Sequence, residues 1–203
     1  MRSFVIVLPS ALASDAFLLD DVPGTSGRLD IGLRCVRAAM LTSHGLRRDV
    51  VVYLVLGGGP RAPRTLRIRA DEVRFLRPDE RSLAVLAQKV LAATVDDETP
   101  GFSPVKPGVA MARGGLSCVV PEVSGSVLHV LDESGADLRA AAGLGQGDHT
   151  FFLGGPAGFD DASRETLSAL GADLVCVGPV SLHAEDVVAI VSNELDRHSG
   201  PPP

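Results

Sequence analysis

Three short apolar runs in the last third of the chain each end in a glycine-, serine- or proline-bearing turn, and this repeat most constrains the fold. The runs are residues 127–131, 150–153 and 174–177, and their turns are 132–135, 154–158 and 178–181. Apolar runs of this length, bounded by turn residues, are typical of buried strands. The last two turns lead into segments with helical spacing of apolar residues, 163–170 and 184–197. Alternating strands and helices predict an α/β fold with a mainly parallel sheet and flanking helices.

The first half of the chain shows the same two patterns. Residues 4–8, 49–56 and 65–70 are expected to be strands, the second covered on both faces because it is almost continuously apolar. Apolar residues recur at helical spacing from Leu29 to Met40, and a second helix is expected from Asp79 to about Thr94. We expect the first helix to end at residues 43–45, since glycine often ends a helix, and residues 96–109 to form a long loop.

Charge is divided unevenly along the chain, whose net charge is −6. Residues 1–81 carry 13 arginines against nine Asp and Glu, whereas residues 82–203 carry six Lys and Arg against 16 Asp and Glu. A basic part beside an acidic part favours contact with nucleic acid or a membrane surface, and arginine binds phosphate in a bidentate way. The alternative is a solvated surface without a specific partner.

Several kinds of site and location are disfavoured. The cysteines Cys35, Cys118 and Cys176 form no C-x-x-C pair and the five histidines lack a metal-ligand spacing, so no metal site is expected. No stretch approaches the ~20 apolar residues of a membrane span, and thiols without a disulfide pattern suit a reducing cytoplasm. Cys176 is expected in the core. The chain also lacks the P-loop, the nucleophile elbow and the three-glycine dinucleotide fingerprint.

The three turns therefore remain as the candidate site. In open α/β sheets, ligands bind outside the carboxyl ends of the strands, and glycine there lets the backbone approach a ligand closely. The spacing predicts a small-molecule pocket lined by backbone, without identifying the ligand. That these turns only reverse the chain is an equally weighted alternative on spacing alone.

Five segments, in this order, resemble the SPOUT methyltransferases, and among them the archaeal tRNA pseudouridine-54 N1-methyltransferases. They are residues 21–30 (DVPGTSGRLD), 43–50 (SHGLRRDV), 78–81 (PDER), 178–184 (GPVSLHA) and 193–196 (NELD). The resemblance covers nearly the whole chain. It implies a cytoplasmic, S-adenosylmethionine-dependent homodimer with a C-terminal trefoil knot. Its expected activity is N1-methylation of pseudouridine at position 54, in the T-loop of tRNA.

The resemblance also implies an organisation and a cofactor site. Residues 1–203 would form one domain, with an Arg-rich, RNA-facing part at 1–110 and a cofactor-binding part at 111–203. Two other functions stay open: another SPOUT RNA methyltransferase, acting on ribosomal RNA pseudouridine N1 or a ribose 2′-hydroxyl, and a non-catalytic RNA-binding or nucleotide-sensing module. Cofactor contacts would fall on nine residues: Leu131, Gly154, Val177, Gly178, Pro179, Val180, Ser181, Leu182 and Val187.

For the chemistry, Asp30 is the candidate to accept or orient the N1 proton, because a desolvated carboxylate can have its pKa raised. Arg28 is the candidate to pair with a base carbonyl or the adjacent phosphate. The plainer interpretation is that Asp30 is an exposed first-turn residue favoured by the helix dipole and Arg28 a surface charge. RNA backbone contacts are expected from six arginines: Arg47, Arg48, Arg61, Arg64, Arg67 and Arg69.

Overall fold

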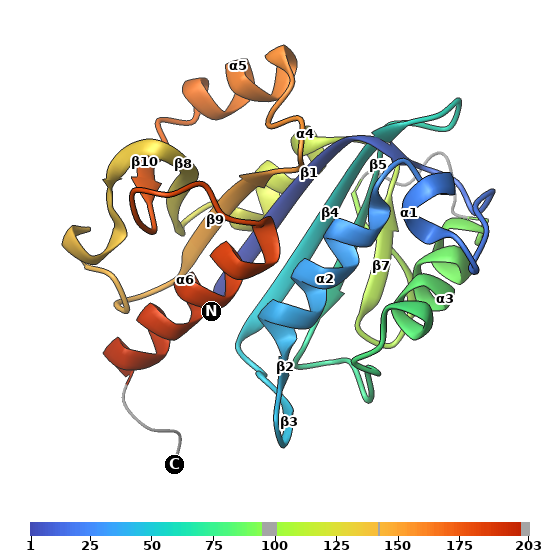
Figure 1. Ribbon diagram of the computed structural model, residues 1–203, viewed down its shortest axis with the longest axis horizontal. Coiled ribbons are helices and arrows are strands. Elements are labelled where there is room, and N and C mark those ends of the chain that lie inside the picture. The colour runs from blue at the N-terminus through green and yellow to red at the C-terminus, as the bar shows by residue number, and fades with distance from the viewer. Residues whose placement is uncertain (95–100, 142, 200–203) are drawn as a thin grey trace.

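The computed structural model describes residues 1–94, 101–141 and 143–199, and an eight-stranded sheet runs through its centre (Figure 1). The strand order is β10-β8-β9-β1-β4-β5-β7-β6. The first five strands in this order are parallel, and β5, β7 and β6 each run antiparallel to their neighbours. The strands are β1 (Arg2–Leu12), β4 (Val50–Gly58), β5 (Arg64–Arg69), β6 (Ser103–Lys106), β7 (Val109–Ala112), β8 (Val127–Asp137), β9 (His149–Gly154) and β10 (Asp173–Cys176).

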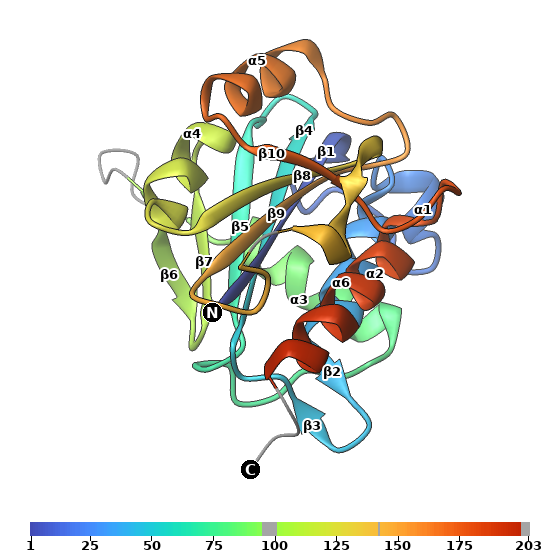
Figure 2. The ribbon, with the colours of Figure 1, turned by 90° about the vertical axis from the view of Figure 1, so that its left-hand side faces the viewer.

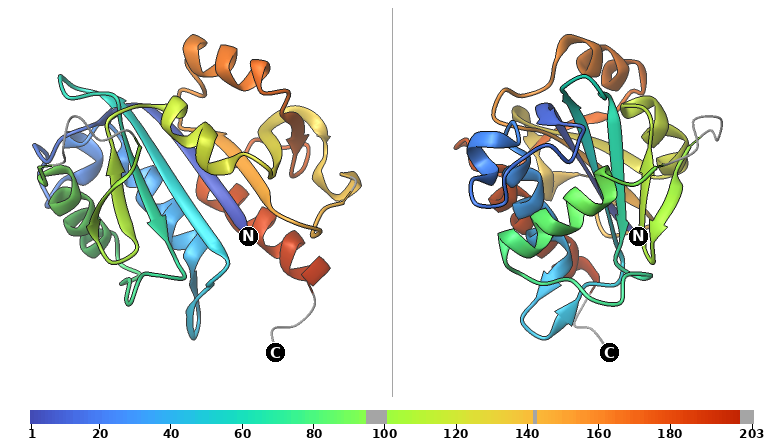
Figure 3. Two further views of the ribbon diagram at one scale, coloured as in Figure 1. Left: turned by 180° about the vertical axis from the view of Figure 1, so that it is seen from behind. Right: turned by 90° about the vertical axis from the view of Figure 1, so that its right-hand side faces the viewer.

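Helices lie on both faces of this sheet, which confirms the predicted α/β fold with a mainly parallel sheet and flanking helices. Three of them, α2, α3 and α6, cover the face that is seen in Figure 1, and the view from behind shows α4 on the other (Figure 3). The helical elements are α1 (Val22–Thr25), α2 (Leu29–Met40), α3 (Glu80–Leu91), α4 (Leu116–Val119), η1 (Val120–Val123), η2 (Leu138–Ala140), α5 (Asp161–Ala169) and α6 (Ala184–Ser199).

The alternation of side chains along the strands fills two cores. Phe4, Ile6 and Leu8 of β1 point into the larger core beneath α2, α3 and α6, while Val5 and Val7 point into the smaller one beneath α4, η1 and α5. Because the strand period is two, a strand that is apolar at every position is buried on both faces. Both cores together fix β1 and its neighbours, so the ends of these strands form a rigid edge.

Three sequence-based boundaries are wrong. The turn expected at residues 132–135 lies within β8, which continues to Asp137 because β10 pairs with it again at Ala136 and Asp137 after an irregularity. The helix expected to end at residues 43–45 ends at Met40, because Leu41 already takes an extended backbone and starts a small hairpin of β2 (Leu41–Thr42) and β3 (Gly45–Leu46). Gly45 therefore belongs to the hairpin rather than to a helix cap. The expected loop at 96–109 contains β6 and the start of β7, although residues 95–100 lie outside the described ones. Gly108, at φ +71°, makes the tight turn between these strands. The strands are stabilised by pairing of β7 with β5 and β6, which a local sequence pattern does not show.

The last third of the chain takes a path that brings distant segments together. After β9 the chain passes through α5 to β10 at the edge of the sheet, beyond β8, and then returns as α6 to lie against α2 (Figure 2). This return sets the turn before α6 beside the start of α2. The C-terminal trefoil knot stays a prediction.

Candidate functional site

A cavity of about 490 Å³ opens where β9 and β10 end, beside residues 131–133 in the middle of β8. Its wall combines turns from the last third of the chain with the start of α2, as the return of α6 allows. Its volume falls in the range of small-molecule sites, roughly 300–1,000 Å³. It is lined by Arg28, Ile31, Arg34, Leu131, Asp132, Glu133, Leu153, Gly154, Gly155, Pro156, Gly158, Phe159, Arg164, Cys176, Val177, Gly178, Val180, Ser181, Leu182, His183, Ala184, Glu185 and Val187.

The structure brings together eight of the nine residues assigned to the cofactor, and leaves only Pro179 out of the lining. Gly154 is required by its own turn, since an added Cβ would lie 2.7 Å from the backbone carbon of Gly158. At Gly178 an added Cβ would meet no atom within 4 Å, so a side chain there would take up open space. Cys176, expected in the core, instead lines the cavity and is half-buried.

The middle of β8 supplies acidic groups that were not singled out from the sequence. Asp132 Oδ1 accepts hydrogen bonds from the backbone and hydroxyl of Ser134, at 2.9 and 2.6 Å. These hydrogen bonds hold the pKa of Asp132 below its ordinary value. Glu133 accepts a hydrogen bond from Ser181, which connects the middle of β8 to the turn after β10. Their position directly after an apolar run was the signal that could have found them.

Arg28 lines the cavity and has an unusual backbone conformation. It has φ +72°, and among the described residues it is the only non-glycine with a positive φ. Such a conformation is costly for a side-chain residue and is often found at functional sites. Gly27 precedes it at φ +65°, and an added Cβ at Gly27 would collide with the carbonyl oxygen of Ser10. Ser26 then starts α2, since its hydroxyl accepts a hydrogen bond from the Leu29 amide at 3.0 Å.

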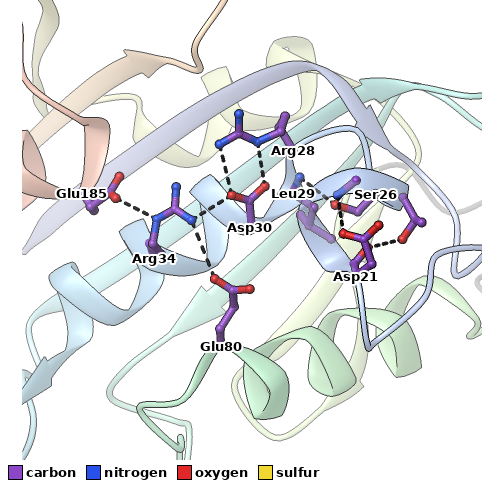
Figure 4. Close-up of polar contacts among 10 residues, drawn as sticks. Asp21, Ser26, Arg28, Leu29, Asp30, Arg34, Glu80 and Glu185 are labelled. Atoms are coloured by element: carbon purple, nitrogen blue, oxygen red, sulfur yellow. Dashed lines mark hydrogen bonds and ion pairs between the residues drawn. The ribbon is translucent and has the colours of Figure 1, made fainter.

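Asp30 lies between two guanidinium groups (Figure 4). Its oxygens accept hydrogen bonds from Arg28 at 3.1 and 3.3 Å and from Arg34 at 2.8 Å, and its side chain is only 1% exposed. Burial pushes the pKa of Asp30 upward, but the hydrogen bonds from both arginines and their charges outweigh it, so the pKa lies below its ordinary value. The expected rise in pKa is therefore wrong, as is the alternative of an exposed residue. Asp30 also does not line the cavity, whereas Arg28 does.

Arg34 connects this cluster to the cofactor side of the cavity. Its Nε donates to Glu185, in the first turn of α6, at 2.7 Å, and its Nη1 lies 3.7 Å from Glu80 at the start of α3. The pKa of Arg34 is raised: burial lowers it, but the hydrogen bonds to Glu185 and Asp30 outweigh burial. One guanidinium thus joins three helices at the cavity wall, which places the start of α2 relative to the turn that precedes α6.

The first three arginines assigned to RNA differ in how freely they face solvent. Arg47 pairs with Asp196 of α6, and Arg48 donates to two backbone carbonyls of the loop after β5, at 2.8 and 2.9 Å. Arg61 is about half-exposed and lies 3.6 Å from Asp15. Arg61 is therefore the freest of these three.

The three arginines of β5 are engaged within the protein. Arg64 is 7% exposed and donates to the carbonyl of Leu91 at 3.1 Å. Arg67 pairs with Glu122 and lies over the ring of Phe102. Arg69 pairs with two acidic residues, Asp71 and Glu72, at 2.9 and 2.7 Å. An RNA role for these side chains stays a prediction, because each guanidinium already has a partner in the protein.

Within the described part of the chain, no group of three or more potential ligand residues is arranged to hold a metal ion. In the same part, none of the helices combines the length and apolar character that a bilayer crossing requires.

The sequence matches known proteins over nearly its full length. Residues 1–199 match a family model described as SAM-dependent RNA methyltransferases. The chain is 39% identical to a tRNA (pseudouridine(54)-N(1))-methyltransferase of Methanosarcina acetivorans, over 97% of this chain and 92% of that one. It is 38% identical to the enzyme of the same name from Halobacterium salinarum, over 97% and 96%. A crystal structure of Archaeoglobus fulgidus Nep1 bound to S-adenosylhomocysteine has a similar fold, with a TM-score of 0.64 and 19% identity over 97% of this chain and 98% of that one.

Proposed function

The chain belongs to the SAM-dependent RNA methyltransferase family, and from this we propose that it methylates N1 of pseudouridine 54 in the T-loop of tRNA. Its relatives at 36–39% identity carry that activity in their names. The observation that carries the proposal is that Arg28 lines the same cavity as the turns that are proposed to bind the cofactor. Arg28 and these turns lie at opposite ends of the sequence, yet they line one cavity.

The cavity has the chemistry to hold S-adenosylmethionine, the methyl donor of this family. Apolar side chains for the adenine ring come from Leu131, Val177 and Leu182, which line the cavity. Carboxylates suit the ribose hydroxyls and the ammonium group, and Asp132 and Glu133 line the same wall. The proposed cofactor residues remain Leu131, Gly154, Val177, Gly178, Pro179, Val180, Ser181, Leu182 and Val187.

When bound there, S-adenosylmethionine supplies a methyl group that is already activated by its sulfonium. The protein must then bring N1 of the base in line with this methyl group, which is catalysis by positioning. N1 of pseudouridine loses its proton, forms a bond to the methyl carbon as the carbon–sulfur bond breaks, and no covalent intermediate with the protein is needed. The proton leaves to water.

We assign the handling of the base to Arg28 and Asp30. Arg28 is half-exposed at the cavity wall, and its free N–H groups are available to a carbonyl of the base. A cation there stabilises the negative charge that develops on the ring when N1 loses its proton. Asp30, whose pKa is lowered, orients Arg28 by two hydrogen bonds. Orientation therefore fits Asp30 better than proton acceptance does.

The remaining proposals concern assembly, location and RNA contacts. A homodimer is supported by Val180 and Leu182, which are 65% and 43% exposed on the turn at the cavity. Residues 1–203 are proposed to act as one domain, since a single sheet takes strands from both parts. A tRNA substrate and the free cysteines suit the cytoplasm. Of the six arginines proposed to contact RNA, Arg61 is about half-exposed with one ion pair at 3.6 Å, and the others are proposed to add to the positive field.

The deciding experiment uses tRNA transcripts that differ only at position 54. Transfer of a labelled methyl group is measured with uridine 54 and with pseudouridine 54, which a pseudouridine synthase installs beforehand. We expect transfer only to the pseudouridine transcript. Equal labelling of both transcripts, or labelling of ribosomal RNA fragments alone, would show that the protein acts on another RNA target. Calorimetric binding of S-adenosylmethionine without transfer to any RNA would indicate a non-catalytic module.

A further inference from the structure

The loop between β5 and α3 displays an aromatic ring between two free cations. Phe75 is 72% exposed, the highest value among the large apolar side chains that the structure describes. Its neighbours Arg74 and Arg77 are also exposed, and within the described ranges neither makes an ion pair or a hydrogen bond. Most of the arginines that were predicted to contact RNA are engaged within the protein, whereas Arg74 and Arg77, which were not among them, are not.

This loop is held rigid from beneath. Arg48 donates hydrogen bonds to the carbonyls of Ala70 and Val73, at 2.8 and 2.9 Å. Val73 and Leu76 are anchored in the core at 4% and 6% exposure. Gly108 packs against the loop so closely that an added Cβ would lie 2.5 Å from the Val73 nitrogen. With a fixed backbone and two buried anchors, the ring of Phe75 stays on the surface.

The nearby acidic residues are occupied. Asp71 and Glu72 pair with Arg69, and Asp79 caps α3 by accepting a hydrogen bond from the Ser82 amide at 2.8 Å. The two free cations therefore favour an anionic partner. A second copy of this chain docked here by two-fold symmetry would bring four guanidiniums together without a free carboxylate.

The loop begins at the end of the sheet opposite to the cavity. The Ala70 amide donates to the carbonyl of Val50, where β4 begins, whereas the cavity lies where the parallel strands end (Figure 1). β4 is nine residues long, so Ala70 is separated from the carboxyl ends of the strands by roughly 25–30 Å at about 3.3 Å per residue. The loop then leads to α3, whose first residue, Glu80, lies 3.7 Å from Arg34 at the cavity wall.

We propose that Phe75, Arg74 and Arg77 form a second RNA contact site, at which an unstacked base of the tRNA lies on the ring and the arginines bind flanking phosphates. Single-stranded or splayed-out nucleotides are commonly bound in this way, by stacking on an aromatic side chain beside basic groups. The proposal rests on the proposed function, because it concerns the same tRNA. The bound nucleotide is not the methylated one, because none of Arg74, Phe75 and Arg77 lines the cavity.

The test compares three full-length variants: Phe75→Ala, the double variant Arg74→Gln/Arg77→Gln, and the control Arg139→Gln. Arg139 is a 64% exposed arginine that is paired with Asp137. The Kd for pseudouridine-54 tRNA should rise roughly 5- to 20-fold in Phe75→Ala, from the loss of one stacked base. In the double variant the slope of log Kd against log salt concentration should fall by about 1 to 2. KM for tRNA should rise by more than kcat falls, and the control should match wild type.

Two results would overturn the inference alone. The first is a wild type that binds and methylates tRNA while the Phe75 and arginine variants bind it within twofold of wild type. The second is an altered oligomeric state of Phe75→Ala in sedimentation velocity, which would make the loop a subunit contact. A wild type that does not bind tRNA would overturn both the inference and the proposed function.

Discussion

Replacing Asp30 by Asn tests the coupling between stability and catalysis at the start of α2. The substitution keeps the size of the side chain but removes the charge between Arg28 and Arg34. Breaking a fully buried ion pair costs about 3–5 kcal/mol. Here the arginines are 51% and 31% exposed, so water can solvate them and we expect a loss of about 2 kcal/mol in the free energy of unfolding.

The stabilisation that Asp30 provides should depend on pH in a defined direction. The pKa of Asp30 is lower in the folded protein than in the unfolded chain, so its ionisation stabilises the fold above the unfolded pKa. That contribution is lost as pH falls through the lowered folded pKa. The difference in melting temperature between wild type and Asp30→Asn should therefore be largest near pH 7 and shrink in acid.

The activity of this variant separates the two roles of the carboxylate. With Arg28 no longer held, kcat should fall by about 10- to 100-fold, as for loss of one preorganised stabilising group. Calorimetric binding of S-adenosylmethionine should be retained, since Asp30 does not line the cavity. The control is Asp20→Asn, an exposed carboxylate that is paired with Arg81. An unchanged kcat, or a melting-temperature difference that is constant with pH, would refute the reasoning.

Three further predictions follow from single contacts. Gly154→Ala should weaken S-adenosylmethionine binding at least tenfold by calorimetry and lower the melting temperature, because its Cβ would press on the Gly158 backbone; normal binding would show that this turn can move. Arg64→Met should lower the melting temperature through its lost hydrogen bond to Leu91, yet leave tRNA affinity within about twofold, since it is buried; a tenfold loss of affinity would return it to the RNA surface. Burial, together with the charge of His149, lowers the pKa of His129 to about 4. Because the unfolded chain then binds this proton more readily than the folded protein, the free energy of unfolding should fall as pH drops from about 6.5 to 4. A His129→Gln variant should show a flatter melting-temperature profile over that range, and an identical profile would contradict it.

The sequence predicted the parts of the site that depend on local pattern. The apolar runs around Leu153 and Val177 end in turns, and the rule that ligands bind at the ends of parallel strands placed the cavity there. The run that ends at Leu131 also lines the cavity, although its strand continues to Asp137. The helix from Leu29 to Met40 follows directly from apolar spacing. These features depend on periods of two and 3.6 residues, which a single sequence contains.

Other parts depend on contacts between distant segments, which no local pattern contains. Arg34 and Glu185 are 151 residues apart, and their ion pair exists only because α6 returns to α2. The lowered pKa of Asp30 requires both of its arginine partners, so burial alone gave the wrong direction. Arg64 was predicted to contact RNA, but it is buried against the end of α3.

The identity of the methylated nucleoside tests the central claim most directly. Pseudouridine-54 tRNA is incubated with the protein and S-adenosylmethionine, digested to nucleosides, and analysed by chromatography and mass spectrometry against synthetic standards. We predict N1-methylpseudouridine as the new product, absent when position 54 is uridine and strongly reduced in Arg28→Ala. A 2′-O-methylated nucleoside, or a base methylated at N3, would contradict the account.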